Sequence, residues 1–254
     1  MTLLRALHAE MLKMKRTIAL KMVVLAPAIG VLVVLFVASQ SPFTVLHRDS
    51  NNEWTELTRT NLRFWAMLML PLYITLECAL IAGLDHSENQ WKSLLARPLP
   101  RWTLYVAKLT IVLAMTAVAT LVLLFGILMD GAILPRLQTE APFRFPVPWA
   151  AIFRDGAQVF GLVFLAVTIQ HWISLRWSSF SVAVGTGIVA SVVGFFAVVA
   201  RKLDSWPQYF PWALPMLVDE GRVHNIQTGL IISGALGLVV AVAGCWDFCR
   251  REVT

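Results

Sequence analysis

Six long apolar runs divide this sequence, and each is long enough to cross the hydrocarbon core of a bilayer as a helix. The runs lie near 18–38, 62–84, 104–129, 152–175, 180–200 and 228–246. Backbone polar groups inside a bilayer must be satisfied within the chain, so segments of this kind are helical. The sequence therefore predicts an all-α, polytopic membrane protein, with residues 1–254 forming a single transmembrane domain.

The composition excludes other broad classes. Hydrophobic residues make up 58% of the chain and charged residues only 14%, which is too apolar for a soluble domain of this size. The net charge of +6 is spread over the segments between the apolar runs rather than gathered in a basic stripe. We therefore attribute the positive charge to membrane topology and expect no nucleic-acid partner.

Lysine and arginine residues predict the orientation. With six spans both termini lie on one side, and the segments on that side hold ten basic residues: Arg5, Lys13, Lys15, Arg16, Lys92, Arg97, Arg101, Arg176, Arg250 and Arg251. The opposite loops, 39–61, 130–151 and 201–227, are longer in total but hold seven basic residues together with eight acidic ones. The positive-inside rule therefore places both termini in the cytoplasm.

Two of the outer loops are rich in proline and aromatic residues, namely 145–149 and 206–212. Aromatic rings favour the headgroup zone, so we expect short turns or interfacial helices on the membrane surface. We favour the interpretation that these residues are part of an aromatic belt at the membrane interface. The alternative is that they hold a substrate at the outer opening of a transport path.

The first 17 residues form an amphipathic basic segment. Leu4, Leu7, Met11 and Met14 share one face of a helix, and basic residues occupy the others. Such a helix lies along the inner leaflet before the first span. A simple positive-inside anchor explains the same pattern equally well.

The loop between the second and third spans, 85–101, predicts a short amphipathic cytoplasmic helix. Trp91, Leu94 and Leu95 lie on one face, Asp85 or Ser87 is a candidate N-cap, and Pro98 ends the helix. Exposed Trp and Leu side chains on a cytoplasmic helix indicate a protein partner, whereas an ordinary interfacial hairpin requires none.

The order of residues in these two segments resembles a known family. The N-terminal segment carries Glu10, Lys13, Lys15 and Arg16, and the loop reads Trp91-Lys92-Ser93-Leu94-Leu95, followed by Pro98, Arg101, Tyr105 and Ala107-Lys108. Together with the span layout, this resembles an ABC-2 type transporter permease, and it is most similar to the lantibiotic-immunity and bacitracin-resistance permease group. The resemblance is sharpest over 85–108.

The resemblance implies a transmembrane subunit in the bacterial cytoplasmic membrane. It implies pairing with a second permease copy or paralogue, and assembly on two separate ATPase subunits that bind ATP and magnesium. The contact with the ATPases would involve the N-terminal helix and the loop helix, at Leu7, Glu10, Met11, His86, Glu88, Trp91, Lys92, Leu94, Leu95 and Arg97. The chain itself contains no G-x-x-x-x-G-K-[ST] phosphate loop, so we expect no bound cofactor on this subunit.

Glu77 lies inside the second span, one turn after Tyr73. Ionisable residues within a span are costly and face protein or water rather than lipid. Glu77 and Tyr73 could line a substrate path, or Glu77 could accept a hydrogen bond within the bundle. A basic residue such as Lys108 is a candidate partner for its carboxylate.

Small residues recur at every fourth position of the last span, at Gly229, Ser233, Gly237, Ala241 and Cys245. This ridge allows another helix to approach closely. We favour packing of this ridge within the subunit, and an interface between subunits is the alternative. The glycine-containing span 180–200 is a plausible neighbour.

The sequence indicates no catalytic or metal site. Gln170 and His171 lack a second ligand at metal-binding spacing, and Asp247 is expected to pair with Arg250 or Arg251. The leading functional hypothesis is therefore a permease that moves a hydrophobic or amphipathic compound, such as an antimicrobial peptide. A non-transporting membrane scaffold or assembly factor is the alternative, and an intramembrane lipid-modifying enzyme is a weaker one.

Overall fold

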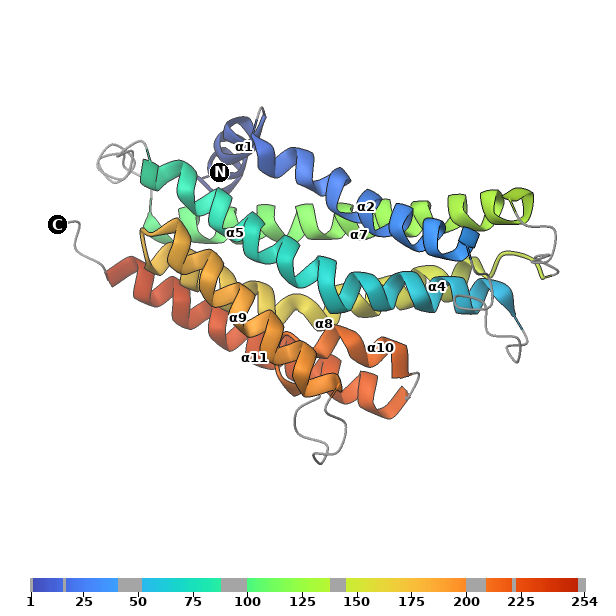
Figure 1. The fold of residues 1–254 in the computed structure, drawn as a ribbon. Helices are drawn as coiled ribbons and strands as arrows, with labels where there is room; N and C mark the ends of the chain where they lie inside the picture. The colour runs from blue at the N-terminus through green and yellow to red at the C-terminus, as the bar shows by residue number, and fades with distance from the viewer. Residues whose placement is uncertain are drawn as a thin grey trace.

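The computed structural model describes residues 2–15, 17–40, 52–87, 100–137, 145–199, 209–220 and 223–250. These residues form helices, with no strand among them (Figure 1). The long helices are α1 (Thr2–Met14), α2 (Ile18–Gln40), α4 (Glu53–Phe64), α5 (Leu70–Ser87), α7 (Arg101–Leu137), α8 (Trp149–Arg176), α9 (Phe180–Val199) and α11 (Val223–Arg250).

Six helical segments are long and apolar enough to cross a membrane: α2, α4 together with α5, α7, α8, α9 and α11. The predicted all-α fold with six spans is confirmed. The six segments run alternately along one bundle, so the N-terminal helix and the C-terminal end of α11 lie at the same end (Figure 1). We call this the terminal end of the bundle and the other the distal end.

The helices extend beyond the predicted spans, and α7 shows why. Its 37 residues are about 55 Å long, well beyond the thickness of a hydrocarbon core. Lys108 and Asp130 are both buried within it, and the stretch between them carries no charged residue and covers about 30 Å. Asp130, predicted to begin an outer loop, therefore continues the helix, and the uncharged stretch from Lys108 to Asp130 is long enough to cross a hydrocarbon core.

The second span begins earlier than predicted. Much of the expected loop 39–61 is the helix α4, which Asn52 caps by accepting a hydrogen bond from the backbone N–H of Trp54 at 3.0 Å. A π-helical turn at Trp65–Met69 joins α4 to α5, with the N–H of Leu70 bonded to the carbonyl oxygen of Trp65. This irregular turn ends two residues before Pro71, which belongs to the first turn of α5 and has no N–H to donate to the preceding turn.

The aromatic segment before α11 is folded into the protein. Residues 209–220 include a 3-10 turn at Leu214–Met216 and the short helix α10 (Leu217–Glu220). Trp212 and Leu214 are buried, so this part of the predicted surface loop packs against the bundle instead of lying on the membrane. Residues 201–208 lie outside the described part of the chain.

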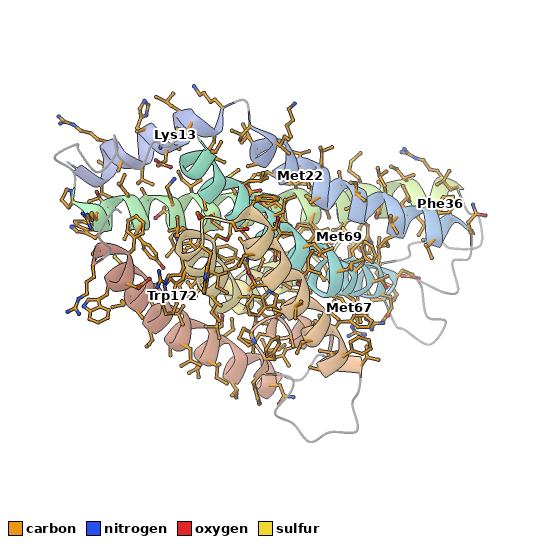
Figure 2. All side chains as sticks on the ribbon, turned by 60° about the vertical axis from the view of Figure 1, so that its left-hand side comes forward. Lys13, Met22, Phe36, Met67, Met69 and Trp172 are labelled. Carbon is orange, nitrogen blue, oxygen red and sulfur yellow. The ribbon has the colours of Figure 1, made fainter. Side chains whose placement is uncertain are left out.

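The outer surface of the bundle is apolar, as lipid contact requires. Exposed large side chains such as Phe36, which is labelled in Figure 2, cover the outer side of α2. The helices α9 and α11 are the least covered of the spans. Exposed tryptophans occur at both ends: Trp102, Trp177 and Trp246 at the terminal end, and Trp149 at the distal end. This arrangement is typical of interfacial aromatic belts.

Gly187 allows α9 to approach α5 closely, which leads to a prediction. A Cβ atom at Gly187 would collide with the side chain of Thr75, whose hydroxyl is fixed by a 2.8 Å hydrogen bond to the carbonyl oxygen of Pro71. We expect Gly187→Ala to lower the free energy of unfolding by about 1–3 kcal/mol through overpacking. Gly185, two residues earlier on α9, faces open space, so Gly185→Ala is the matched control.

Thermal unfolding in detergent tests this pair of variants. Alanine favours helix over glycine by up to about 1 kcal/mol, so Gly185→Ala is expected to be neutral or stabilising. Equal melting temperatures for the two variants would show that α9 does not contact α5 at Gly187.

Candidate functional site: the terminal end of the bundle and the core of α5

The helix α1 is held against α7 by a buried ion network. Glu10 is 3% exposed, and its carboxylate oxygens lie 2.6 Å from the Lys108 ammonium and 2.7 Å from that of Lys13. Lys108 is 1% exposed, so this is a buried pair between residues 98 positions apart. Lys108, considered above as a candidate partner of Glu77, pairs with Glu10, and the Glu77 carboxylate oxygens have no hydrogen-bond partner among the described residues.

The buried face of α1 differs from the predicted one. Ala6, Glu10 and Met14, spaced four residues apart, face the bundle. Leu7 is half-buried against the core, while Leu4 and Met11 are exposed at 74% and 61%. The helix therefore presents a separate apolar face away from α7. Of the residues predicted to contact a partner, Met11 is available on this surface and Glu10 is not.

Most of the predicted loop helix lies outside the described residues. Asp85, His86 and Ser87 belong to the last turn of α5, so Asp85 continues that helix instead of capping a new one. Glu88, Trp91, Lys92, Leu94, Leu95 and Arg97 fall in 88–99, which the structure does not describe. Their role in a partner contact remains a prediction.

Glu77 is fully buried in α5, and among the described residues neither of its carboxylate oxygens has a hydrogen-bond partner. The hydroxyl of Tyr73, one turn away and 2% exposed, is also unpartnered. Buried polar groups are normally satisfied, and each unpaired one costs about 1–3 kcal/mol. The two residues predicted for a substrate path thus share a face of α5 and form an unsatisfied polar pair in the core of the bundle.

A second polar group lies at the distal end, where sequence reasoning placed no functional residue. Asn61 of α4 and Asp130 of α7 lie close together there, and both side chains are 1% exposed. The Asn61 amide donates a 3.1 Å hydrogen bond to the carbonyl oxygen of Leu57. Beside them, the indole of Trp54 lies where a Cβ on Gly131 would be, and its N–H donates to the carbonyl oxygen of Phe145 at 3.1 Å. These contacts tie α4, α7 and the segment before α8 together.

The small-residue ridge of α11 packs against α8. The hydroxyl of Ser233 lies 2.8 Å from the carbonyl oxygen of Gly161 and accepts a hydrogen bond from the N–H of Leu165 at 3.1 Å. Side chains added at Gly229 or Gly237 would meet Leu162 or Phe164 of α8. Ala241 and Cys245 continue the ridge and lie partly buried against the core. The glycines of α9 do not face this ridge, since Gly187 meets α5 and Gly194 meets Trp212.

The polar residues near the end of α8 make contacts within the bundle, and Gln170 Oε1 and His171 Nε2 have no hydrogen-bond partner among the described residues. Gln170 donates a 2.8 Å hydrogen bond to the carbonyl oxygen of Ala183, and His171 contacts the Tyr105 ring edge-on at 4.9 Å between centroids. Asp247 accepts a hydrogen bond from Trp172, which is labelled in Figure 2, and lies 3.8 Å from Arg176. Of the two arginines predicted to pair with Asp247, Arg250 has its guanidinium over the Trp246 ring, and Arg251 lies outside the described residues.

Comparison with known proteins now decides the family. The family model described as "ABC-2 family transporter protein" matches residues 6–196, which is well over half of the chain. The chain belongs to the ABC-2 family of transporter proteins. The matched region of this ABC-2 protein runs from α1 into α9, and α11 lies beyond it. No curated protein and no solved structure matches the chain.

Family membership and the six spans together identify a multi-pass membrane component of a transporter. Within the described residues, no group of three or more His, Cys, Asp or Glu side chains could hold a metal ion. The ABC-2 chain thus offers three features for function: the exposed face of α1, the unsatisfied pair Tyr73 and Glu77, and the buried Glu10–Lys108 contact. Sequence reasoning named the first two. The only sequence signal for the third was a lysine inside an apolar span, which requires a partner somewhere.

Proposed function

We propose that this chain is the permease subunit of an ATP-driven transporter that exports a hydrophobic or amphipathic compound from the membrane. ABC-2 membership over 6–196 carries the proposal, and the six-span architecture supports it. The proposed complex contains two ATPase subunits, which bind ATP and magnesium, and a second permease copy or paralogue. Its proposed place is the bacterial cytoplasmic membrane, with the terminal end in the cytoplasm.

The proposed substrate class is an antimicrobial peptide, as in the lantibiotic-immunity and bacitracin-resistance permeases that the sequence resembles. Such a compound enters from the bilayer and carries both apolar and polar groups. The pair Tyr73 and Glu77 supports a path along α5, because it offers a carboxylate and a hydroxyl with no partner of their own. A cationic or hydrogen-bonding group of the substrate would satisfy them during passage.

The proposed ATPase contact consists of the exposed face of α1 and the loop 88–97. Met11 and Leu4 support it, because they are large, apolar and exposed at the terminal end. Leu7 and Glu10 hold α1 in place behind this face. Since the Glu10 carboxylate binds Lys108, a force on α1 reaches α7 through a direct ion pair.

The proposed contact with the second permease is the outer face of α9, with α2 and α5 beside it. Only Ala183, Gly187, Ser191 and Gly194 of α9 are buried within this chain. The rest of the helix presents a long apolar surface, including Val189 and Phe196, exposed at 63% and 60%. A second copy would cover this surface without exposing polar groups to lipid.

Co-purification tests the proposal directly. The chain is tagged at its C-terminus, extracted from its native membrane in mild detergent, and its partners are identified by mass spectrometry. The expected result is a stoichiometric soluble protein with a phosphate-binding loop. Repeated purification without any ATPase would favour the scaffold hypothesis over the transporter.

A charge in the loop is expected to uncouple the complex. Leu94→Glu places a carboxylate in the proposed apolar contact, where it would lose hydration without gaining a partner. We expect substrate-stimulated ATP hydrolysis and export by the reconstituted complex to fall at least about tenfold, while membrane insertion is unchanged. Leu137→Glu is the control, since Leu137 is exposed at the distal end of α7. Full export by Leu94→Glu would remove Leu94 from the contact.

A further inference from the structure

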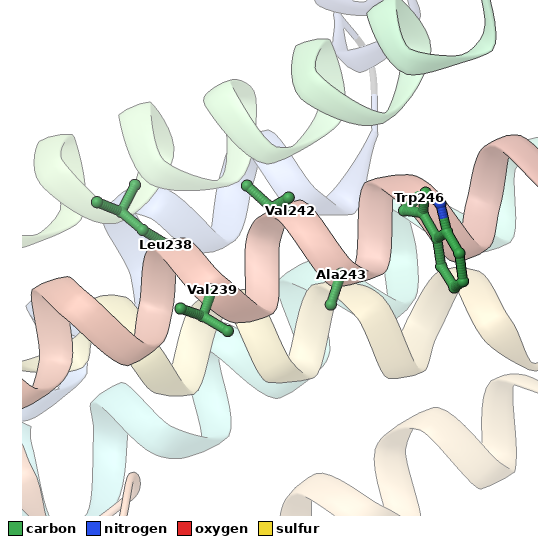
Figure 3. A pocket seen from close by; sticks show the side chains of 5 residues that line it. All are labelled: Leu238, Val239, Val242, Ala243 and Trp246. Atoms are coloured by element: carbon green, nitrogen blue, oxygen red, sulfur yellow. The ribbon is translucent and has the colours of Figure 1, made fainter.

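One face of α11 is apolar, exposed and hollowed. Five residues line the hollow, Leu238, Val239, Val242, Ala243 and Trp246, and all of them come from α11 (Figure 3). Leu238, Val242 and Trp246 are exposed at 61%, 70% and 58%. The small side chain of Ala243 leaves space between its larger neighbours. Arg250 continues the same face one turn after Trp246.

Contacts with α7 give the depth of this face in the membrane. The ring centroid of Tyr105 lies 5.9 Å from that of Phe248, and a Cβ atom at Gly244 would collide with the Tyr105 hydroxyl. Tyr105 precedes Lys108, where the uncharged stretch of α7 begins, by one turn. With that stretch spanning the hydrocarbon core, residues 238–243 would lie within the core, Trp246 at its edge and Arg250 among the lipid headgroups.

Arg250 provides positive charge at that level. Its guanidinium lies 3.7 Å from the centre of the Trp246 ring, and it has no carboxylate partner among the described residues. The nearest acid along the helix, Asp247, is engaged by Trp172 and Arg176. Arg101 reaches the same level, where it donates a 3.3 Å hydrogen bond to the carbonyl oxygen of Cys249. An anionic group at this end of α11 would meet net positive charge.

We propose that this face of α11 binds one acidic phospholipid, with an acyl chain in the hollow and the phosphate on Arg250. From Leu238 to Arg250 the helix rises about 18 Å, close to the depth of one leaflet's hydrocarbon plus the start of the headgroup zone. The Trp246 ring lies between the two parts, as amphipathic aromatic groups do at interfaces. A zwitterionic lipid fills the hollow equally well but offers Arg250 no net negative charge.

The same charge argues against a second copy of the chain as the occupant. A two-fold axis along the membrane normal brings residues at the same depth together, so the two faces would place Arg250 against Arg250. Like charges brought together in this way oppose association. A lipid with an anionic headgroup instead brings a negative charge to Arg250, which favours binding.

Native mass spectrometry of the full chain in nanodiscs containing phosphatidylcholine and phosphatidylglycerol tests the proposal. The expected result is that the wild type retains one phosphatidylglycerol in preference to phosphatidylcholine. Arg250→Ala is expected to lower this retention about tenfold, because it removes a charge-assisted contact with phosphate. Ala243→Leu is expected to lower it by filling the hollow. Arg154→Ala at the distal end and Ala114→Leu on the exposed side of α7 are the controls.

Equal retention of the two lipids by the wild type, or unchanged phosphatidylglycerol retention in Arg250→Ala, would overturn the proposal. A photo-crosslinking residue at Val242 gives an independent result. A phospholipid adduct supports the site, whereas a crosslink between two copies of the chain replaces the lipid with a subunit interface. Both measurements report binding and do not depend on transport.

Discussion

Replacing Glu10 with glutamine is expected to lower the free energy of unfolding by about 3–5 kcal/mol. The substitution leaves the Lys108 ammonium buried without its carboxylate, while its side chain is only 2% exposed. Removing one partner of a buried ion pair costs far more than the pair contributes, because the remaining charge has lost its hydration. Thermal unfolding in detergent measures the change, and protease cleavage of α1 reports whether this helix has detached.

Two further variants identify the cause. The double variant Glu10→Gln with Lys108→Met removes both fully buried charges and is expected to recover most of the lost stability, since the remaining Lys13 side chain is 25% exposed to water. Glu56→Gln is the control, since Glu56 pairs with Arg59 at 3.0 Å and the arginine is 40% exposed. That pair is worth less than about 1 kcal/mol. A double variant no more stable than Glu10→Gln would show that the ion pair does not hold α1.

Replacing Glu77 with methionine is expected to separate stability from transport. The carboxyl group has no hydrogen bond to lose, and methionine fills a similar volume without buried polar atoms. We expect the melting temperature to be unchanged or raised, with up to about 1–3 kcal/mol gained for each unpaired group removed. Export by the reconstituted complex is expected to fall at least about tenfold, because the substrate path loses its polar group.

The interpretation of Glu77 depends on both measurements. Cys78→Ala is the control for disturbance of the same turn, since Cys78 is buried beside Glu77. Glu77→Gln distinguishes a need for charge from a need for hydrogen bonding. A large loss of stability in Glu77→Met would mean that Glu77 holds the bundle together, and normal export would remove it from the substrate path.

The sequence was sufficient to predict the spans because a bilayer accepts so few structures. Runs such as 18–38 and 180–200 agree closely with α2 and α9. The predicted spans stopped short of the observed ends of α4, α7 and α11. Hydropathy detects the part of a helix that contacts lipid, whereas the helix itself continues as long as its backbone hydrogen bonds are satisfied. Asn52 and its hydrogen bond mark the true start of α4, and a polar cap of this kind is weak beside a hydropathy signal.

Pairings between distant residues could not be predicted. Sequence spacing places Glu77 and Lys108 inside neighbouring spans, but the rotation of each helix decides which side chains meet. In the structure Lys108 faces α1 and Glu77 faces the core of the bundle. The same holds for Asn61 and Asp130, which lie close together although they were placed in two different predicted loops. The small-residue ridge of α11 was visible in the sequence, whereas only the structure shows that α8 is the helix that packs against it.

The uncharged stretch of α7 between Lys108 and Asp130 sets a fixed distance between two charged levels, and Glu10 attaches α1 to one of them. The height of α1 above the bilayer midplane is therefore set by a rigid helix rather than by the lipid surface. In a thicker membrane α7 can respond by standing more upright, and α1 must move with it. Bilayer thickness would thus act on α1 through its contacts with α7, of which the Glu10–Lys108 ion pair is one.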